Sequence, residues 1–291
     1  MFGALTAAVA KSRAKRNELM DEKGRASGHL MLITPERVFY AGLLGRPRAR
    51  CSGAFHIYVA IRDGLWLFTA DGREVYGELL AVPPNVRHTL TSDHRSAICV
   101  TIEPESVRAG AFEELSRRLG EERELFAGRI RQAYGELHNR ARRDDITSSG
   151  FDRMCFGEAL PRRSLDPRVV RAIAQIGRFS GEPVTAASCA SEAGLSASRF
   201  LHLFKQETGI SFRSFRAWKR ARHLLHFANQ DLNLAHLAQD IGYPDSTHFS
   251  HSIRRFYGLK PRAIFSGSRD LAIYRSGRVD AGNSAWTQEA G

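Results

Sequence analysis

A spacing that occurs twice in the C-terminal third constrains this chain more than any other feature of its sequence. Three positions of the first copy are matched 48 residues later, and three more are matched 49 residues later. The matched pairs are Thr185 and Asn233, Ala190 and Ala238, Gly194 and Gly242, Phe200 and Phe249, Phe204 and Ile253, and Gly209 and Gly258. The repeat predicts two similar structural units in this part of the chain.

Each position of the repeat has a physical role in a helical hairpin. Thr185 and Asn233 can cap the start of a helix by accepting a backbone N–H bond. The alanine lets a second helix cross closely, and the glycine can adopt the left-handed conformation that ends the first helix. Ser196 and Asp245 are then placed to cap a second helix. This is the order of elements in a helix-turn-helix, whose second helix enters the major groove of DNA.

A single hairpin of this kind is weak evidence, because helical hairpins that bind nothing have the same pattern. Two copies are stronger evidence, and residues 211–227 between them predict one continuous helix. Its residues, at 1.5 Å each, give a length of roughly 25 Å. Such a helix is long enough to hold two recognition helices about one turn of DNA, ~34 Å, apart.

Positive charge gathers in the same region. The whole chain has a formal net charge of +12, and residues 166–268 contain 14 Lys or Arg and seven Asp or Glu, a net charge of +7. More than half of the excess therefore lies in about a third of the chain. This distribution favours a polyanionic partner. The alternative is a solvated basic surface that has no partner.

Two stretches carry a resemblance to a known family. They are LSASRFLHLFKQETGIS at residues 195–211 and IGYPDSTHFSHSIRRFYGLKP at residues 241–261. The second stretch has the order Gly-aromatic, polar turn, Phe-Ser, basic pair, aromatic-x-Gly and Pro. Residues 166–268 therefore resemble the DNA-binding domain of the AraC/XylS family of transcription regulators. The resemblance implies an all-α domain with two helix-turn-helix units. It also implies double-stranded DNA and RNA polymerase as partners, and activation more often than repression.

The resemblance and the helical spacing together give the candidate DNA contacts. On the first recognition helix we expect base contacts from Ser198, Arg199, Leu201 and His202 and a backbone contact from Lys205. On the second we expect base contacts from Ser246, Thr247 and His251 and backbone contacts from Ser250, Arg254, Arg255 and Lys260. Imidazole can donate or accept at a base edge, leucine can pack against a thymine methyl, and Arg and Lys suit guanine or phosphate. The alternative is that these are solvated polar faces.

Residues 26–104 have the pattern of a β domain. Short apolar runs are separated by Asp63-Gly64 and Asp71-Gly72, dipeptides that favour tight hairpins. Several short strands at such spacing predict a sandwich or a barrel. The stretch Gly77–Leu90, with its glycine, proline and histidine, resembles the second motif of the cupins. We therefore expect a cupin-like barrel that binds a small-molecule effector or mediates dimerisation.

The rival hypothesis for the same region is a cupin-type metal enzyme fused to a DNA-binding module. The first cupin motif should supply two histidines and a glutamate, but residues 51–64 contain only His56. A metal needs three or four ligands, and His56 with His88 makes two. We therefore expect no metal, no cofactor and no catalytic residue. The candidate effector pocket consists of His56, Trp66, Phe68, Tyr76 and His88, with core packing as the alternative for each.

The remaining segments are expected to have simpler roles. Residues 1–25 read as a basic leader, 141–165 as a linker and 269–291 as a flexible tail. Residues 105–140 predict amphipathic helices whose apolar stripe, from Phe112 to Tyr134, contacts the β domain or forms the interface of a homodimer. No apolar run reaches the ~18–20 residues of a membrane-spanning helix.

The sequence as a whole predicts an α+β protein of two domains. The first is a cupin-like β-barrel with a helical appendage, and the second is an all-α domain with two helix-turn-helix units. The N-terminus lacks the order of a secretory signal, and the four cysteines lie far apart, so we expect a cytoplasmic protein. We interpret it as a sequence-specific transcription regulator and not an enzyme. A DNA-binding protein without base preference is a third hypothesis.

Overall fold

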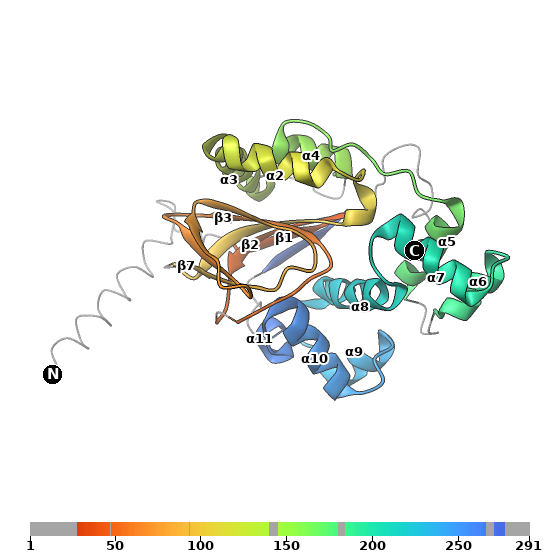
Figure 1. The fold of residues 1–291 in the computed structure, drawn as a ribbon. Helices are drawn as coiled ribbons and strands as arrows, with labels where there is room; N and C mark the ends of the chain where they lie inside the picture. Colours follow the sequence, from red (N-terminus) through yellow and green to blue (C-terminus); the bar gives the residue numbers. More distant parts are fainter. Residues whose placement is uncertain are drawn as a thin grey trace.

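The computed structural model describes residues 28–46, 48–92, 94–139, 145–179, 184–265 and 271–276. A β-rich region, residues 28–160 within these limits, is followed by a helical region, residues 166–265 (Figure 1). The α+β class is therefore confirmed. Residues 1–25, which we expected to form a basic leader, lie outside the described part of the chain.

The larger of two sheets has six strands. In order across the sheet they are β6 (Leu79–Val82), β3 (Phe55–Ala60), β8 (Ser96–Ile102), β2 (Arg37–Leu43), β1 (Leu30–Ile33) and β9 (Ala272–Arg275). β9 runs parallel to β1, and the other neighbours are antiparallel. β9 lies in the segment that we expected to be a flexible tail, so that expectation is wrong for residues 272–275. The backbone of β9 pairs with the N–H and C=O groups along the edge of β1, which would otherwise lack hydrogen-bond partners.

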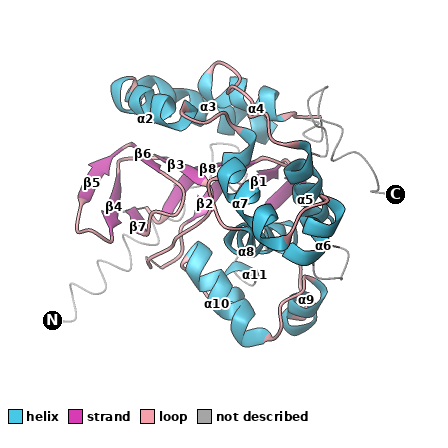
Figure 2. Ribbon diagram, turned by 45° about the vertical axis from the view of Figure 1, so that its right-hand side comes forward, coloured by secondary structure: helices cyan, strands magenta, loops and turns pink. Residues whose placement is uncertain are grey.

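The smaller sheet has three strands, in the order β5 (Glu74–Gly77), β4 (Leu65–Thr69) and β7 (His88–Ser92). Leu65, Leu67 and Leu90 of this sheet pack against Tyr58 and Leu80 of the larger sheet. In the described residues the strand pairing leaves two separate sheets, as Figure 2 shows at β4, β5 and β7. The closed barrel that we expected is therefore not confirmed.

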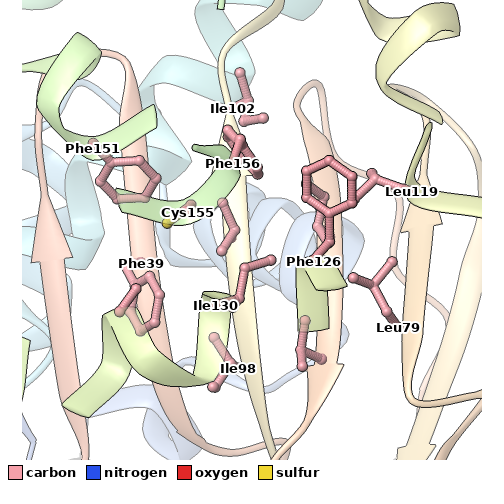
Figure 3. Packing of buried hydrophobic residues seen from close by; sticks show 14 of the residues in the cluster. Phe39, Leu79, Ile98, Ile102, Leu119, Phe126, Ile130, Phe151, Cys155 and Phe156 are labelled. Carbon is pink, nitrogen blue, oxygen red and sulfur yellow. The ribbon is translucent and has the colours of Figure 1, made fainter. Parts of the chain in front are cut away.

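Three helices cover the outer face of the larger sheet. They are α2 (Ala111–Glu121), α3 (Arg123–Asn139) and α4 (Ser148–Phe156). Side chains at every second strand position, such as Phe39 and Ile98, meet the apolar stripe of α3, where Phe126 and Ile130 are fully buried (Figure 3). The stripe that we expected to serve as a dimer contact is thus largely used inside the chain.

Helix α4 lies in the segment that we expected to be a linker, so this expectation is wrong for residues 148–156. Phe151 and Phe156 are buried in the same core as the sheet. Asp152 accepts hydrogen bonds from Nε and Nη2 of Arg37, at 2.7 and 2.9 Å. Apolar packing and this buried ion pair fix α4 against the start of β2.

The helical region consists of short helices around a central one. They are α5 (Pro167–Arg178), α6 (Ala186–Glu192), α7 (Ala197–Thr208), α8 (Phe212–His223), α9 (Leu234–Asp240), α10 (Ser246–Tyr257) and α11 (Pro261–Phe265). The continuous helix expected over residues 211–227 is instead α8 followed by a 3₁₀ turn, η2 (Leu224–Phe227). Such tightening of the last turn is frequent at helix ends. None of the described helices has the length and apolar character needed to cross a membrane.

Candidate nucleic-acid interface

The first copy of the repeat folds as a helix, a turn and a second helix. Thr185 and Ser188 form reciprocal caps at the start of α6: each side chain accepts from the other residue's backbone N–H, at 3.0 and 3.1 Å. Gly194 adopts a φ of +64° in the turn. Ser196 then caps α7 by accepting from Arg199 N. The caps predicted at Thr185 and Ser196 are confirmed.

The second copy repeats this arrangement with different side chains. Asn233 Oδ1 accepts from the backbone N–H of Ala235 at the start of α9, at 2.9 Å. Gly242 adopts a φ of +80°, and Asp245 Oδ1 accepts from the N–H of Thr247 at the start of α10, at 2.8 Å. The caps predicted at Asn233 and Asp245 are confirmed as well.

The apolar frame of each unit is buried on its inner side. Phe200 and Phe204 of α7 pack edge-on with Phe212 of α8, at ring-centroid distances of 5.6 and 5.2 Å. In the second unit Phe249 and Ile253 of α10 are buried in a cluster with residues of α9. Each recognition helix therefore has one face fixed to its own unit and leaves the opposite face to solvent.

The opposite faces carry the residues that we expected to contact DNA. On α7 the exposed candidates are Ser198, Arg199, Leu201, His202 and Lys205. On α10 and just beyond it the exposed candidates are Ser246, Thr247, His251, Arg254, Arg255 and Lys260, and Ser250 is half-buried. The fold thus keeps these side chains out of the core, as a docking face requires.

Helix α8 joins the two units rather than standing apart from them. Its Phe215 lies in the core of the first unit, 5.2 Å from the ring of Phe204. On the other side Ala221 accepts a hydrogen bond from the hydroxyl of Tyr257, at the end of α10, at 2.9 Å. Contacts on both sides fix the two recognition helices to α8, which thus acts as one rigid rod between the units.

Comparison with known proteins supports this interpretation. A family model described as a helix-turn-helix domain matches residues 189–266. The HTH-type transcriptional activator RhaS of Escherichia fergusonii is 33% identical over 111 residues, which cover 37% of this chain and 39% of that protein. The chain therefore matches well under half the length of this relative.

The helical region resembles the DNA-binding domain of the AraC/XylS family of regulators. The resemblance drawn from the sequence is thereby confirmed. Two solved structures are similar at lower sequence identity. ToxT of Vibrio cholerae is 12% identical with a TM-score of 0.46, over 79% of this chain and 97% of that one. An AraC-type regulator of Chromobacterium violaceum is 21% identical with a TM-score of 0.33, over 35% of this chain and 92% of that one.

The AraC/XylS-type region is tied to the β-rich region by a buried ionic cluster. Glu103, which follows β8 and is fully buried, accepts from Nε1 of Trp218 at 3.0 Å and from Nζ of Lys219 at 2.6 Å. Nε of Arg222 lies 2.8 Å from the same carboxylate. Burial alone would raise the pKa of Glu103, but Lys219 and Arg222 together hold it below its usual value. No local signal could have revealed this cluster, because its partners lie more than a hundred residues apart in the chain.

A cavity of about 550 Å³ lies where the two regions meet. Met31 and Val38 of the larger sheet form one wall, and Leu225 and Ile264 of the AraC/XylS-type region form another. Arg50 lies at this cavity, and among the described residues its Nε and Nη2 atoms are buried without a hydrogen-bond partner. The site combines apolar walls with a buried guanidinium, that of Arg50, two of whose nitrogens lack a hydrogen-bond partner among the described residues.

Two of the five residues expected to form an effector pocket lie close to this cavity. His56 lines it, and its ring accepts or donates toward Ser52 and Thr101. His88 does not line it, but its Nε2 lies 2.9 Å from the hydroxyl of Tyr58, which does. Burial lowers the pKa of His56 to about 3 and that of His88 to about 4, so both rings are neutral near pH 7.

The other three residues expected in the effector pocket, Trp66, Phe68 and Tyr76, lie elsewhere, so the prediction is wrong for them. Trp66 and Tyr76 are 39% and 51% exposed, and Phe68 is half-buried. Their rings contact one another on the outer face of the smaller sheet. Alternation along β4 turns Leu65 and Leu67 inward and therefore turns Trp66 and Phe68 outward. The sequence shows this alternation but does not show which of the two faces is the inner one.

Proposed function

We propose that this chain is a sequence-specific, DNA-binding transcription regulator. The observation that carries the proposal is the pair of helix-turn-helix units fixed to one rod, each with an exposed polar face on its second helix. The excess of positive charge in the same region supports DNA as the partner. By family resemblance, the regulator would act on RNA polymerase, and activation is the commoner outcome.

The chemistry of the exposed side chains supports separate roles in reading and in positioning. His202 and His251 can donate to or accept from base edges, and Leu201 can pack against a thymine methyl. Ser198, Ser246 and Thr247 offer hydroxyls at the helix starts, where recognition helices contact bases. The longer cationic side chains suit phosphates, which fix the register of the protein on the duplex. The residues proposed for this second role are Lys205, Arg254, Arg255 and Lys260, joined by the hydroxyl of Ser250, while Arg199 can reach guanine or phosphate.

Selection of bound sequences from a random duplex pool tests the proposal. We expect a two-part motif whose half-elements lie about ten base pairs apart, one turn of the helix. A pool that shows no enrichment, together with equal affinity for all duplexes and a steep dependence on salt, would instead indicate binding without base preference.

We further propose that a small-molecule effector controls DNA binding from the cavity between the two regions. A volume of about 550 Å³ suits a small ligand. Because walls from both regions meet there, a ligand could prefer one arrangement of the regions over another and so shift their equilibrium. Nε and Nη2 of Arg50, which have no hydrogen-bond partner in the described part of the chain, favour a ligand with an acidic group on an apolar body.

A thermal-shift screen tests the effector proposal. The probes are small organic carboxylic acids, and the primary amide of each acid is its matched control. We expect some acids, and not their amides, to raise the melting temperature of the natural chain but not of Arg50→Met. The control variant is Arg62→Met, which removes an exposed arginine just after β3. It should respond like the natural chain. Equal responses of Arg50→Met and the natural chain would contradict the role of Arg50.

The cupin-type metal enzyme is supported less well. His56 and His88 use their ring nitrogens for hydrogen bonds to Ser52, Thr101, Tyr58 and the Val86 carbonyl. Within the described residues no three His, Cys, Asp or Glu side chains are grouped to hold a metal ion. Metal analysis of the purified protein tests this alternative, and stoichiometric metal would favour it. We also propose that the regulator acts in the cytoplasm as a homodimer, which sedimentation can test.

A further inference from the structure

A segment of the β-rich region lies against the end of the second recognition helix. The backbone N–H of Cys51, which follows β2 in the chain, donates to the carbonyl of Arg255 on α10 at 2.7 Å. At Gly45, a Cβ atom would lie 2.7 Å from a methyl group of Leu259. The β-rich region and α10 are therefore in direct contact where α10 ends.

The contact lies along the face of α10 that carries the candidate base readers. Thr247, His251 and Arg254 are spaced by four and three residues, so they share one face of the helix. Gly258 continues this spacing by four more residues and caps α10 with a φ of +68°. A Cβ atom placed on Gly258 would lie 2.7 Å from the carbonyl oxygen of Arg48. Arg48 thus stands at the end of the row that begins with Thr247.

The side chains around this contact are cationic and exposed. They are Arg46 and Arg48 of the β-rich region and Arg254, Arg255 and Lys260 of the AraC/XylS-type region, and we call these five the basic rim. Arg46, Arg48 and Lys260 border the mouth of the same cavity. Across the described residues no carboxylate forms an ion pair with any of the five. Repulsion among these charges opposes folding and is relieved when a polyanion binds.

We infer that Arg46 and Arg48 bind DNA phosphates next to the segment that α10 reads. The inference rests on the proposed function and extends it, because it assigns part of the DNA surface to the β-rich region. Duplex DNA is the partner that fits, since its phosphates present one negative charge per ~1.7 Å of helix axis and α10 would already be positioned in its groove. The two arginines would contribute affinity without base preference.

The salt dependence of binding to the selected two-part duplex tests the inference. The test variant is Arg46→Ser with Arg48→Ser. The matched control is Arg62→Ser with Arg123→Ser, two exposed arginines of the β-rich region away from the basic rim, so both variants lose the same net charge. A third variant, Arg46→Lys with Arg48→Lys, keeps the charge.

We expect the test variant to lower the slope of log affinity against log salt by about two, since each phosphate contact contributes ~0.9. Its affinities for the selected duplex and for random duplex should fall by the same factor. The control and the lysine variant should keep the natural slope. An unchanged slope, an equal change in the control, or tighter binding by the test variant would each overturn the inference; tighter binding would mean that this segment obstructs DNA. If the natural chain prefers no sequence, the proposed function fails instead.

Discussion

The two helix-turn-helix units have the same caps, glycines and apolar frame, yet their recognition helices end in different surroundings. At Gly209, which ends α7 with a φ of +79°, a Cβ atom would meet no other part of the described chain within 4 Å. At Gly258, which ends α10, the Arg48 carbonyl occupies that space. The first unit also contacts the β-rich region, through η1 (Pro104–Ser106), but the end of its recognition helix is open.

This difference shows that one local pattern can serve two purposes. In both units glycine allows the left-handed conformation that ends the helix. In the second unit the absence of a side chain also lets another part of the chain approach closely. The β-rich region therefore contacts the second recognition helix at its end, whereas it contacts the first unit through η1 and α7.

The largest effect is expected from Glu103→Gln. The substitution leaves Arg222 buried beside a neutral amide and leaves Lys219 with Glu105 as its remaining carboxylate, and breaking a buried ion pair in this way costs about 3–5 kcal/mol of unfolding free energy. Urea unfolding measures the loss, and hydrogen exchange should show α8 and α10 losing more protection than α6 and α7. Glu114→Gln, on the exposed side of α2, is the control that should stay close to the natural chain. Equal loss of protection in both units would contradict the predicted difference between them.

Gly258→Ala and Gly209→Ala compare the two units directly. Both substitutions place a side chain in the left-handed region, which costs about 1–2 kcal/mol. At Gly258 the methyl group must also displace the Arg48 carbonyl, so we expect a total of about 2–5 kcal/mol. Urea midpoints of the two variants give the difference. If Gly209→Ala were equally destabilising, the contact at Gly258 would have no energetic importance.

How much of this could be predicted from the sequence differs between the regions. The caps, the turn glycines and the buried frame of the helical region depend on residues a few positions apart, so the repeat revealed them. The β-rich region depends on pairing between distant segments. Neither β9, which pairs with β1 from the other end of the chain, nor the direction in which Trp66 points is determined by its own neighbours. For the same reason the Glu103 cluster and the basic rim have no local signature.

The two histidines among the candidate base readers, one in each unit, should behave alike despite their different surroundings. His202→Ala and His251→Ala are each expected to weaken binding to the selected duplex by about 1–3 kcal/mol and to relax preference at one base position in their own half-element. Lys205→Ala should instead weaken all sequences equally and reduce the salt slope by about one. Fluorescence anisotropy on duplexes with single base changes measures both. Equal losses on selected and random duplex for the histidine variants would show that the groove assignment is wrong.

The smallest effect is expected from acid. Burial lowers the pKa of His56 to about 3, and that of His223, beside the second unit, to about 4. Between these values and the ordinary pKa near 6.5 the unfolded chain binds more protons, so stability falls as pH falls through this range. For His56 we expect a loss of about 1 kcal/mol between pH 7.5 and 5.5, measured by urea unfolding. His56→Gln should show a smaller loss over the same range, and an equal loss would contradict this cause.

The two units are also expected to differ in their stability toward acid. From Val184 to Thr208 the chain contains one histidine, His202, and it is exposed. His223 stacks on Phe179 at a centroid distance of 3.9 Å, beside the core of the second unit. Hydrogen exchange at pH 5.5 should therefore show α9 and α10 opening before α6 and α7. The reverse order would contradict the assignment of the acid-sensitive groups to the second unit.

The most direct test of the central claim, that two units on one rod read adjacent grooves, is the affinity for duplexes with altered spacing. Five or ten base pairs are inserted between the half-elements of the selected duplex, and binding is compared with that of a duplex that keeps a single half-element. Because α8 fixes the distance between the units, we predict that both insertions reduce the affinity to that of the single half-element. Affinity that is unchanged by the insertions would contradict the claim.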